Sequence, residues 1–188
     1  GYDVPHPVAA IFDLYGPVDW ANPFWREPIP HLASQLPPDL SSSFMNRVYD
    51  EHPVPTKNGV SLEGQSVGPD FADPRQAFAL KQIASGTVLD AILAPGTLNA
   101  VDPLRNIGPR FPPTFIVHGK EDNMVPGYLS RKLYEKLKES GVVCGMLEIP
   151  GEGHTFAAEM EVGGRTWEMQ RKGFDFLEGV VGRGGVKL

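Results

Sequence analysis

A strand, a helix and a second strand within residues 113–150 constrain the fold more than any other feature of the sequence. The two apolar runs, PTFIVHG (113–119) and VVCGMLEIP (142–150), are each bounded by Gly or Pro. Their apolar density is typical of strands that are covered on both faces. Between them leucines recur at i, i+4 and i+8, and Gly141 follows as a stop, which predicts a helix. A right-handed crossover between parallel strands is therefore expected, and the fold class is α/β.

Two further segments extend this unit. The run PVAAIFDLYG (7–16) predicts a third buried strand. The tail TWEMQRKGFDFLEGVVG places Trp167, Phe174, Leu177 and Val181 on one helical face, which predicts a last helix packed on the same sheet. The sequence thus predicts about three parallel strands with flanking helices.

Nearly a hundred residues separate the first predicted strand from the second, far more than a simple crossover needs. This stretch predicts a short helix near SSSFMNRVYD and a longer one over DPRQAFALKQIASGTVLDAIL, where Asp73 suits the cap and Pro74 the first turn. An insertion at the end of a parallel strand tends to cover the ligand cleft. We therefore expect three parts: a core strand (1–17), a large helical lid or cap insertion (18–109) and a C-terminal α/β core (110–188).

Charge and composition exclude several classes of function. The net charge of −6 argues against a surface for nucleic acid or an anionic membrane, and no run approaches the roughly 18 apolar residues of a membrane span. The lone Cys144 excludes an internal disulfide and a cysteine zinc cluster, and His31 and His52 lie beside prolines without ligand spacing. We expect no metal, no cofactor and, because the start lacks signal-peptide features, a cytoplasmic location.

The stretch EGQSVGPD (63–70) contains the G-x-S-x-G pattern of a serine hydrolase nucleophile around Ser66. That pattern requires a buried strand before it and a helix after it. The residues before Ser66 carry Pro53, Pro55 and Gly59 instead, and Pro69 follows. The expected strand before Ser66 and the expected helix after it are both missing from the sequence pattern, so Ser66 is interpreted as a loop or lid serine rather than the nucleophile.

A stronger signal comes from Asp122 and His154, which follow two consecutive predicted strands and lie 32 residues apart, a spacing that one crossover helix fills. Neighbouring strands would place the two side chains at the same sheet edge. A histidine acts as general base when a carboxylate orients its other nitrogen. Two alternatives stay open: Asp122 could cap a helix near Pro126, and a loop histidine is often simply solvated. His118 is expected to support the turn, and Glu121 is the substitute acid if the turn is shifted by one residue.

The motifs HGKEDNMVP and GEGHTF resemble the acid turn and the histidine loop of α/β-hydrolases of the esterase/lipase and prolyl-oligopeptidase-like branches. The resemblance covers essentially the whole chain and implies the C-terminal half of an α/β-hydrolase fold, with Asp122 as triad acid and His154 as triad base. It also implies that the insertion occupies the lid position of the family.

One part of the family pattern is missing. The order Ser, Asp, His would place the nucleophile before residue 7, whereas the first serine is Ser34. We therefore expect the N-terminal half with the nucleophile and oxyanion hole to be absent from this chain, and the first strand to pair with that half of the same protein or with a second copy.

The resemblance implies hydrolysis of a small ester-like acyl substrate by a serine nucleophile. Four aromatic residues of the insertion, Trp20, Phe24, Trp25 and Phe71, are candidates for lining the substrate pocket, although packing of the insertion explains each of them as well. The alternative function is a non-catalytic hydrolase remnant that binds a small apolar ligand or a protein partner. A third possibility makes Ser66 a relocated nucleophile.

Overall fold

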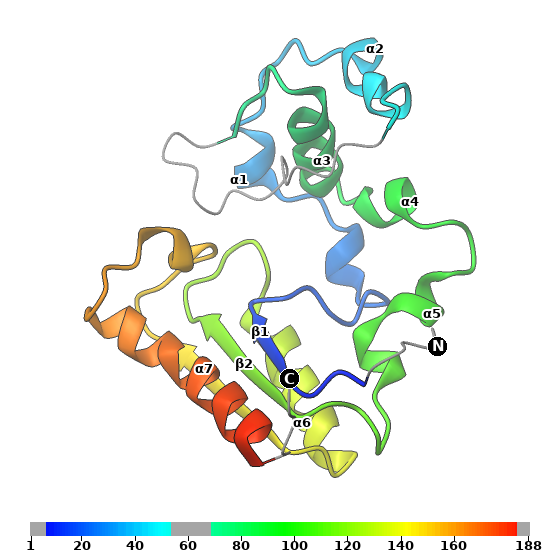
Figure 1. Ribbon diagram of the computed structural model, residues 1–188. Coiled ribbons are helices and arrows are strands. Elements are labelled where there is room, and N and C mark those ends of the chain that lie inside the picture. Colours follow the sequence, from blue (N-terminus) through cyan, green and yellow to red (C-terminus); the bar gives the residue numbers. More distant parts are fainter. Residues whose placement is uncertain (1–6, 54–68, 184–188) are drawn as a thin grey trace. The chain divides into compact units, whose positions relative to one another are not determined.

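The computed structural model describes residues 7–53 and 69–183, and the chain divides into two compact units (Figure 1). The sheet unit comprises Gly1–Asp19 and Asn99–Leu188, and the helical unit comprises Trp20–Leu98. The predicted insertion (18–109) includes the whole helical unit. Its role as a lid stays a prediction.

The sheet unit is built on three parallel strands in the order β1-β2-β3: β1 (Ile11–Leu14), β2 (Thr114–Gly119) and β3 (Cys144–Ile149). Leu14 pairs with Val117, and Val117 pairs with Leu147. These strands confirm the predicted parallel sheet, and each is shorter than the apolar run that predicted it. Because all three run in one direction, their carboxyl ends lie at one edge.

Two long helices flank the sheet, α6 (Gly127–Glu139) and α7 (Arg165–Arg183) (Figure 1). The leucine repeat of α6 is buried, as are Ile116 and His118 on β2. A core cluster on the α7 side of the sheet contains Tyr15, Val117, Ile149 and Phe156, and Met169 of α7 packs against it. Side chains alternate between the two faces of a strand, so both faces of β2 are buried and its sequence reads as a continuous apolar run.

The buried face of α7 differs from the predicted one. Phe174 and Val181 are 52% and 44% exposed, whereas Gln170 and Gly173 are buried. A Cβ atom at Gly173 would lie 2.3 Å from the Phe12 ring, so the absence of a side chain there lets the helix approach β1. The prediction followed the largest apolar residues, but the closest packing is made by the smallest one.

The helical unit consists of short elements. They are η1 (Pro23–Arg26), α1 (Pro30–Ala33), α2 (Ser42–Met45), η2 (Asn46–Tyr49), α3 (Pro74–Ala84) and α4 (Val88–Ile92). Asp73 caps α3 as predicted, since its Oδ1 accepts a hydrogen bond of 2.9 Å from the Arg75 amide. The single long helix predicted from Asp73 onward is wrong, because the chain turns at Gly86 with φ of 68° and starts again as α4.

Three further short elements complete the fold: α5 (Leu98–Val101), η3 (Pro103–Asn106) and η4 (Phe156–Glu159). Within residues 7–53 and 69–183, no helix combines the length and the apolar character that crossing a membrane requires.

Candidate active site

Asp122 lies in the tight turn that follows β2. One carboxylate oxygen, Oδ1, accepts hydrogen bonds from the backbone amides of Met124 (2.9 Å) and Val125 (2.8 Å), just before α6 begins. The side chain is fully buried. The carboxylate therefore closes the turn with one oxygen and keeps the second, Oδ2, for another partner.

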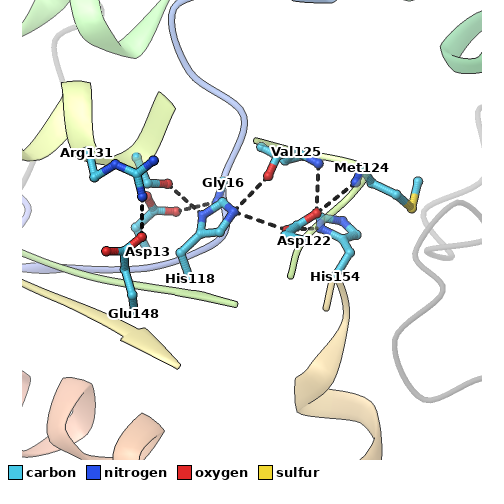
Figure 2. Close-up of polar contacts among 10 residues, drawn as sticks. Asp13, Gly16, His118, Asp122, Met124, Val125, Arg131, Glu148 and His154 are labelled. Carbon is cyan, nitrogen blue, oxygen red and sulfur yellow. Dashed lines mark hydrogen bonds and ion pairs between the residues drawn. The ribbon is translucent and has the colours of Figure 1, made fainter. Parts of the chain in front are cut away.

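That partner is His154, on the loop that follows β3. Its Nδ1 lies 2.8 Å from Asp122 Oδ2, and its side chain is 21% exposed (Figure 2). Gly151 has a φ of 84° and Thr155 a φ of 59°, so the loop turns sharply on both sides of the histidine. The structure thus brings together the two residues that the sequence placed at neighbouring strand ends.

Gly119, the last residue of β2, permits this arrangement. A Cβ atom there would lie 2.4 Å from the carbonyl oxygen of Glu152 and 2.5 Å from that of Gly153. Carbon atoms do not approach backbone oxygens so closely, so any side chain would push the histidine loop away from β2. The glycine is needed for close approach rather than for an unusual backbone angle.

His118 provides a second imidazole beside Asp122. It is fully buried, and its Nε2 lies 2.8 Å from the Val125 carbonyl oxygen and 3.2 Å from Asp122 Oδ2. Its Nδ1 lies 2.7 Å from the hydroxyl of the buried Ser130 on α6. Figure 2 shows both imidazoles turned toward Asp122.

The surroundings of Asp122 and His118 shift their pKa values in opposite directions. Burial opposes ionisation of Asp122, but hydrogen bonds from His118, His154 and the Val125 amide outweigh it and hold the pKa of Asp122 well below its ordinary 3.8. Burial would also lower the pKa of His118, yet the hydrogen bond to Asp122 and the other acceptors around the ring raise it above 6.5. Asp122 is therefore ionised at neutral pH.

Sequence reasoning missed two residues of this site. Tyr15, directly after β1, has a φ of 42° and places its buried ring 4.8 Å from that of His154, measured between centroids. Ser130 anchors His118 from α6. Tyr15 follows a strand end as Asp122 does, so the strand-end rule could have identified it, whereas nothing in the sequence around Ser130 indicates its contact.

The remaining predicted residues lie elsewhere. Glu121, the substitute acid, accepts a hydrogen bond of 2.7 Å from the Gly151 amide through its Oε2. Ser66 lies outside the described residues. The four aromatic candidates, Trp20, Phe24, Trp25 and Phe71, are half-buried in the helical unit, where Phe24 and Trp25 contact each other, and their role in substrate binding stays a prediction.

The Asp122–His154 pair has the geometry of an acid–base pair. With Nδ1 donating to the carboxylate, Nε2 is the ring nitrogen left to take a proton from a nucleophile. The buried carboxylate stabilises the imidazolium that this transfer creates. Among the described residues, no group of three His, Cys, Asp or Glu side chains is arranged to hold a metal ion.

Comparisons with known proteins identify a family for this part of the chain. The model of the prolyl oligopeptidase family (Peptidase_S9) matches residues 86–183, just over half of the chain. The matched part includes β2, α6, β3 and α7, and therefore both Asp122 and His154.

The curated relatives are much longer proteins. The 5-methylorsellinic acid synthase of Aspergillus terreus is 26% identical over 202 residues, which covers 91% of this chain and 8% of that protein. The non-reducing polyketide synthase Preu6 of Preussia isomera is 27% identical over 187 residues, with the same two coverages. The chain thus spans about 8% of the length of these relatives.

Solved structures with some likeness are esterases. A truncated carbohydrate esterase from gut microbiota is 17% identical with a TM-score of 0.44, and covers 93% of this chain and 43% of its own. Esterase 2 of Thermogutta terrifontis is 28% identical with a TM-score of 0.37, and covers 46% of this chain and 30% of its own. On the family match and the parallel sheet, the chain belongs to the prolyl oligopeptidase family and forms a C-terminal part of an α/β-hydrolase fold.

Proposed function

We propose that the protein takes part in serine-dependent hydrolysis of an acyl bond, with Asp122 as the triad acid and His154 as the general base. The observation that carries this proposal is the 2.8 Å hydrogen bond between His154 Nδ1 and Asp122 Oδ2 at the carboxyl ends of β2 and β3. In open parallel sheets, this is the edge where ligands bind.

The proposed reaction has two steps. A serine hydroxyl attacks the carbonyl carbon while His154 Nε2 takes its proton, and the same proton passes to the leaving alcohol or thiol. Water then attacks the acyl-enzyme, again giving its proton to His154, and the carboxylic acid leaves as the serine regains its proton. Asp122 stabilises the imidazolium in both steps.

We further propose that the nucleophile and the oxyanion hole come from an N-terminal half of the same protein, which pairs with β1. Within the described residues, β1 has β2 as its one neighbouring strand. A strand with an unpaired edge offers backbone groups to a further strand. The much greater length of the curated relatives is consistent with such a further part.

The substrate class proposed is a carboxylic ester or a related acyl bond, thioesters included. Several relatives are named as polyketide synthases. Hydrolysis of an ester or thioester would release the acyl group as a carboxylic acid. Trp20, Phe24, Trp25 and Phe71 are proposed to contact the apolar part of the acyl group.

Hydrolysis of p-nitrophenyl acetate and of an N-acetylcysteamine thioester, by the protein that includes the proposed N-terminal half, tests this function. We expect His154→Ala and Asp122→Asn to abolish most of the activity. Two matched controls, His31→Ala on α1 and Glu121→Gln beside Asp122, should keep it. Activity that survives His154→Ala would contradict the proposal, and a folded protein that includes the N-terminal half but has no activity would favour the binding remnant.

A further inference from the structure

The ring of His118 is held at both nitrogens. Nε2 faces two oxygen atoms, the Val125 carbonyl at 2.8 Å and Asp122 Oδ2 at 3.2 Å. A carbonyl oxygen and an ionised carboxylate are both acceptors, so Nε2 must carry a proton whether the ring is neutral or charged. Nδ1 meets the Ser130 hydroxyl, which donates to a neutral ring and accepts from a charged one.

Asp122 in turn receives three hydrogen bonds and one longer polar contact. Two backbone amides hold Oδ1, His154 Nδ1 lies 2.8 Å from Oδ2, and His118 Nε2 lies 3.2 Å from the same oxygen. The carboxylate is fully buried, so water does not replace a donor that is removed. The two amides therefore restrain one end of the carboxylate, and the two imidazoles are the partners that restrain the other end, Oδ2.

The two imidazoles differ in access. The His118 side chain is fully buried and both its nitrogens are bound, whereas the His154 side chain is 21% exposed. His118 therefore does not contact a substrate in this arrangement. It acts on His154 through the oxygen atom that they share.

We propose that His118 is a positioning residue, which shares its Nε2 proton between the Val125 carbonyl and Asp122 Oδ2 and so helps to hold that oxygen in line with His154 Nδ1. Ser130 holds the His118 ring in the plane that this bond requires. The catalytic meaning of the inference rests on the proposed function, but the bond itself is tested without it.

Two variants of His118 separate its nitrogens. In His118→Gln the side-chain amide nitrogen occupies the place of Nε2 and can still donate to Asp122. In His118→Asn the shorter amide reaches only the place of Nδ1, beside Ser130. Both variants remove the ring from the core, so they share the packing loss and differ in the donor to Oδ2.

Proton NMR of the ¹⁵N-histidine-labelled chain gives the first measurement. The Nδ1 proton of His154, bound to a carboxylate, should give a downfield signal that disappears in His154→Ala. We expect His118→Gln to keep this signal. His118→Asn should speed its exchange with solvent by about tenfold, as expected for the loss of one supporting hydrogen bond. Equal exchange rates in wild type and His118→Asn would overturn the proposal. It would also be overturned if His118→Gln and His118→Asn speeded the exchange of the His154 proton equally, because the effect would then come from lost packing alone.

Ser130→Ala keeps the proposal testable if His118→Asn does not fold. This variant leaves Nε2 in place and removes the partner of Nδ1, so the exchange of the His154 proton should rise by a smaller factor. An unchanged exchange rate in folded Ser130→Ala would contradict the role given to Ser130 and to the His118 ring.

Ester hydrolysis connects the inference to the proposed function. We expect His118→Asn to lower kcat at least tenfold with little change in KM, and His118→Gln to stay within about threefold of wild type. If wild type that includes the proposed N-terminal half shows no hydrolysis, the proposed function fails while the NMR result still decides the positioning role.

Discussion

At the residue scale, the site depends on how one carboxylate distributes its two oxygens. The sequence left open whether Asp122 caps a turn or orients His154, and the structure shows both contacts, one for each oxygen. Spacing along the chain can place Asp122 and His154 at one edge, since that follows from strand order. It cannot show which oxygen of Asp122 each partner contacts. It also cannot show that Ser130 and Tyr15 reach the site, because they come from other elements.

Asp122→Asn tests the electrostatic part of this arrangement. The amide fills the same space but removes the charge that stabilises the imidazolium, and it can hold the ring in the wrong tautomer. We expect ester hydrolysis to fall by about 10⁴-fold. Steady-state kinetics measures the rate of ester hydrolysis in Asp122→Asn, with Glu121→Gln as the control variant. A fall of less than tenfold in Asp122→Asn would contradict the role of Asp122.

The raised pKa of His118 predicts a pH dependence of stability. A group whose folded-state pKa is raised stabilises the fold below its unfolded value, here 6.5, and loses that contribution as the pH rises through the folded value. The groups around the ring include Asp13 on β1 and Asp122. Glutamine does not titrate, so the difference in Tm between wild type and His118→Gln should shrink between pH 6 and pH 9. A difference that grows over this range would contradict the assignment.

At the scale of elements, glycines decide how closely strands, loops and helices approach. The three strands and α6 could be predicted because apolar density and leucine spacing report burial directly. The break at Gly86 and the buried face of α7 could not, because a glycine adds nothing to an apolar pattern. Their effect appears only where a neighbouring backbone or ring occupies the missing side chain's place.

Two glycines of α7 form a matched pair for this point. Gly173→Ala would place a Cβ atom against the Phe12 ring, whereas a Cβ atom at Gly179 meets nothing within 4 Å. Overpacking is expected to cost about 1–3 kcal/mol at Gly173. Helix propensity should stabilise Gly179→Ala by up to about 1 kcal/mol. Urea unfolding measures both, and equal effects would disprove the close contact of α7 with β1.

Gly119→Ala tests how β2 supports the histidine loop. The added methyl group would collide with the carbonyl oxygens of Glu152 and Gly153, so the loop that carries His154 must move. We expect a loss of roughly 1–3 kcal/mol in stability together with loss of the downfield His154 signal. If the variant keeps both, the loop does not depend on this contact.

At the scale of the whole molecule, the sheet unit carries Asp122 and His154 side by side, and we propose that the nucleophile comes from another part of the protein. The parallel sheet explains why these two residues meet at the edge formed by β2 and β3. The sequence predicted this edge correctly because parallel strands align their carboxyl ends. It could not identify the substrate, because specificity depends on pocket shape rather than on the strands.

Fluorophosphonate labelling near pH 8, followed by mass analysis of every polypeptide in the purified material, tests the central claim most directly. The account predicts a label on a serine of an N-terminal part, lost in His154→Ala and kept in His31→Ala. A label on Ser66 would contradict the proposed origin of the nucleophile. A label that is unaffected by His154→Ala, or no label on folded wild-type material that includes the N-terminal part, would contradict the assignment of Asp122 and His154 to a serine hydrolase.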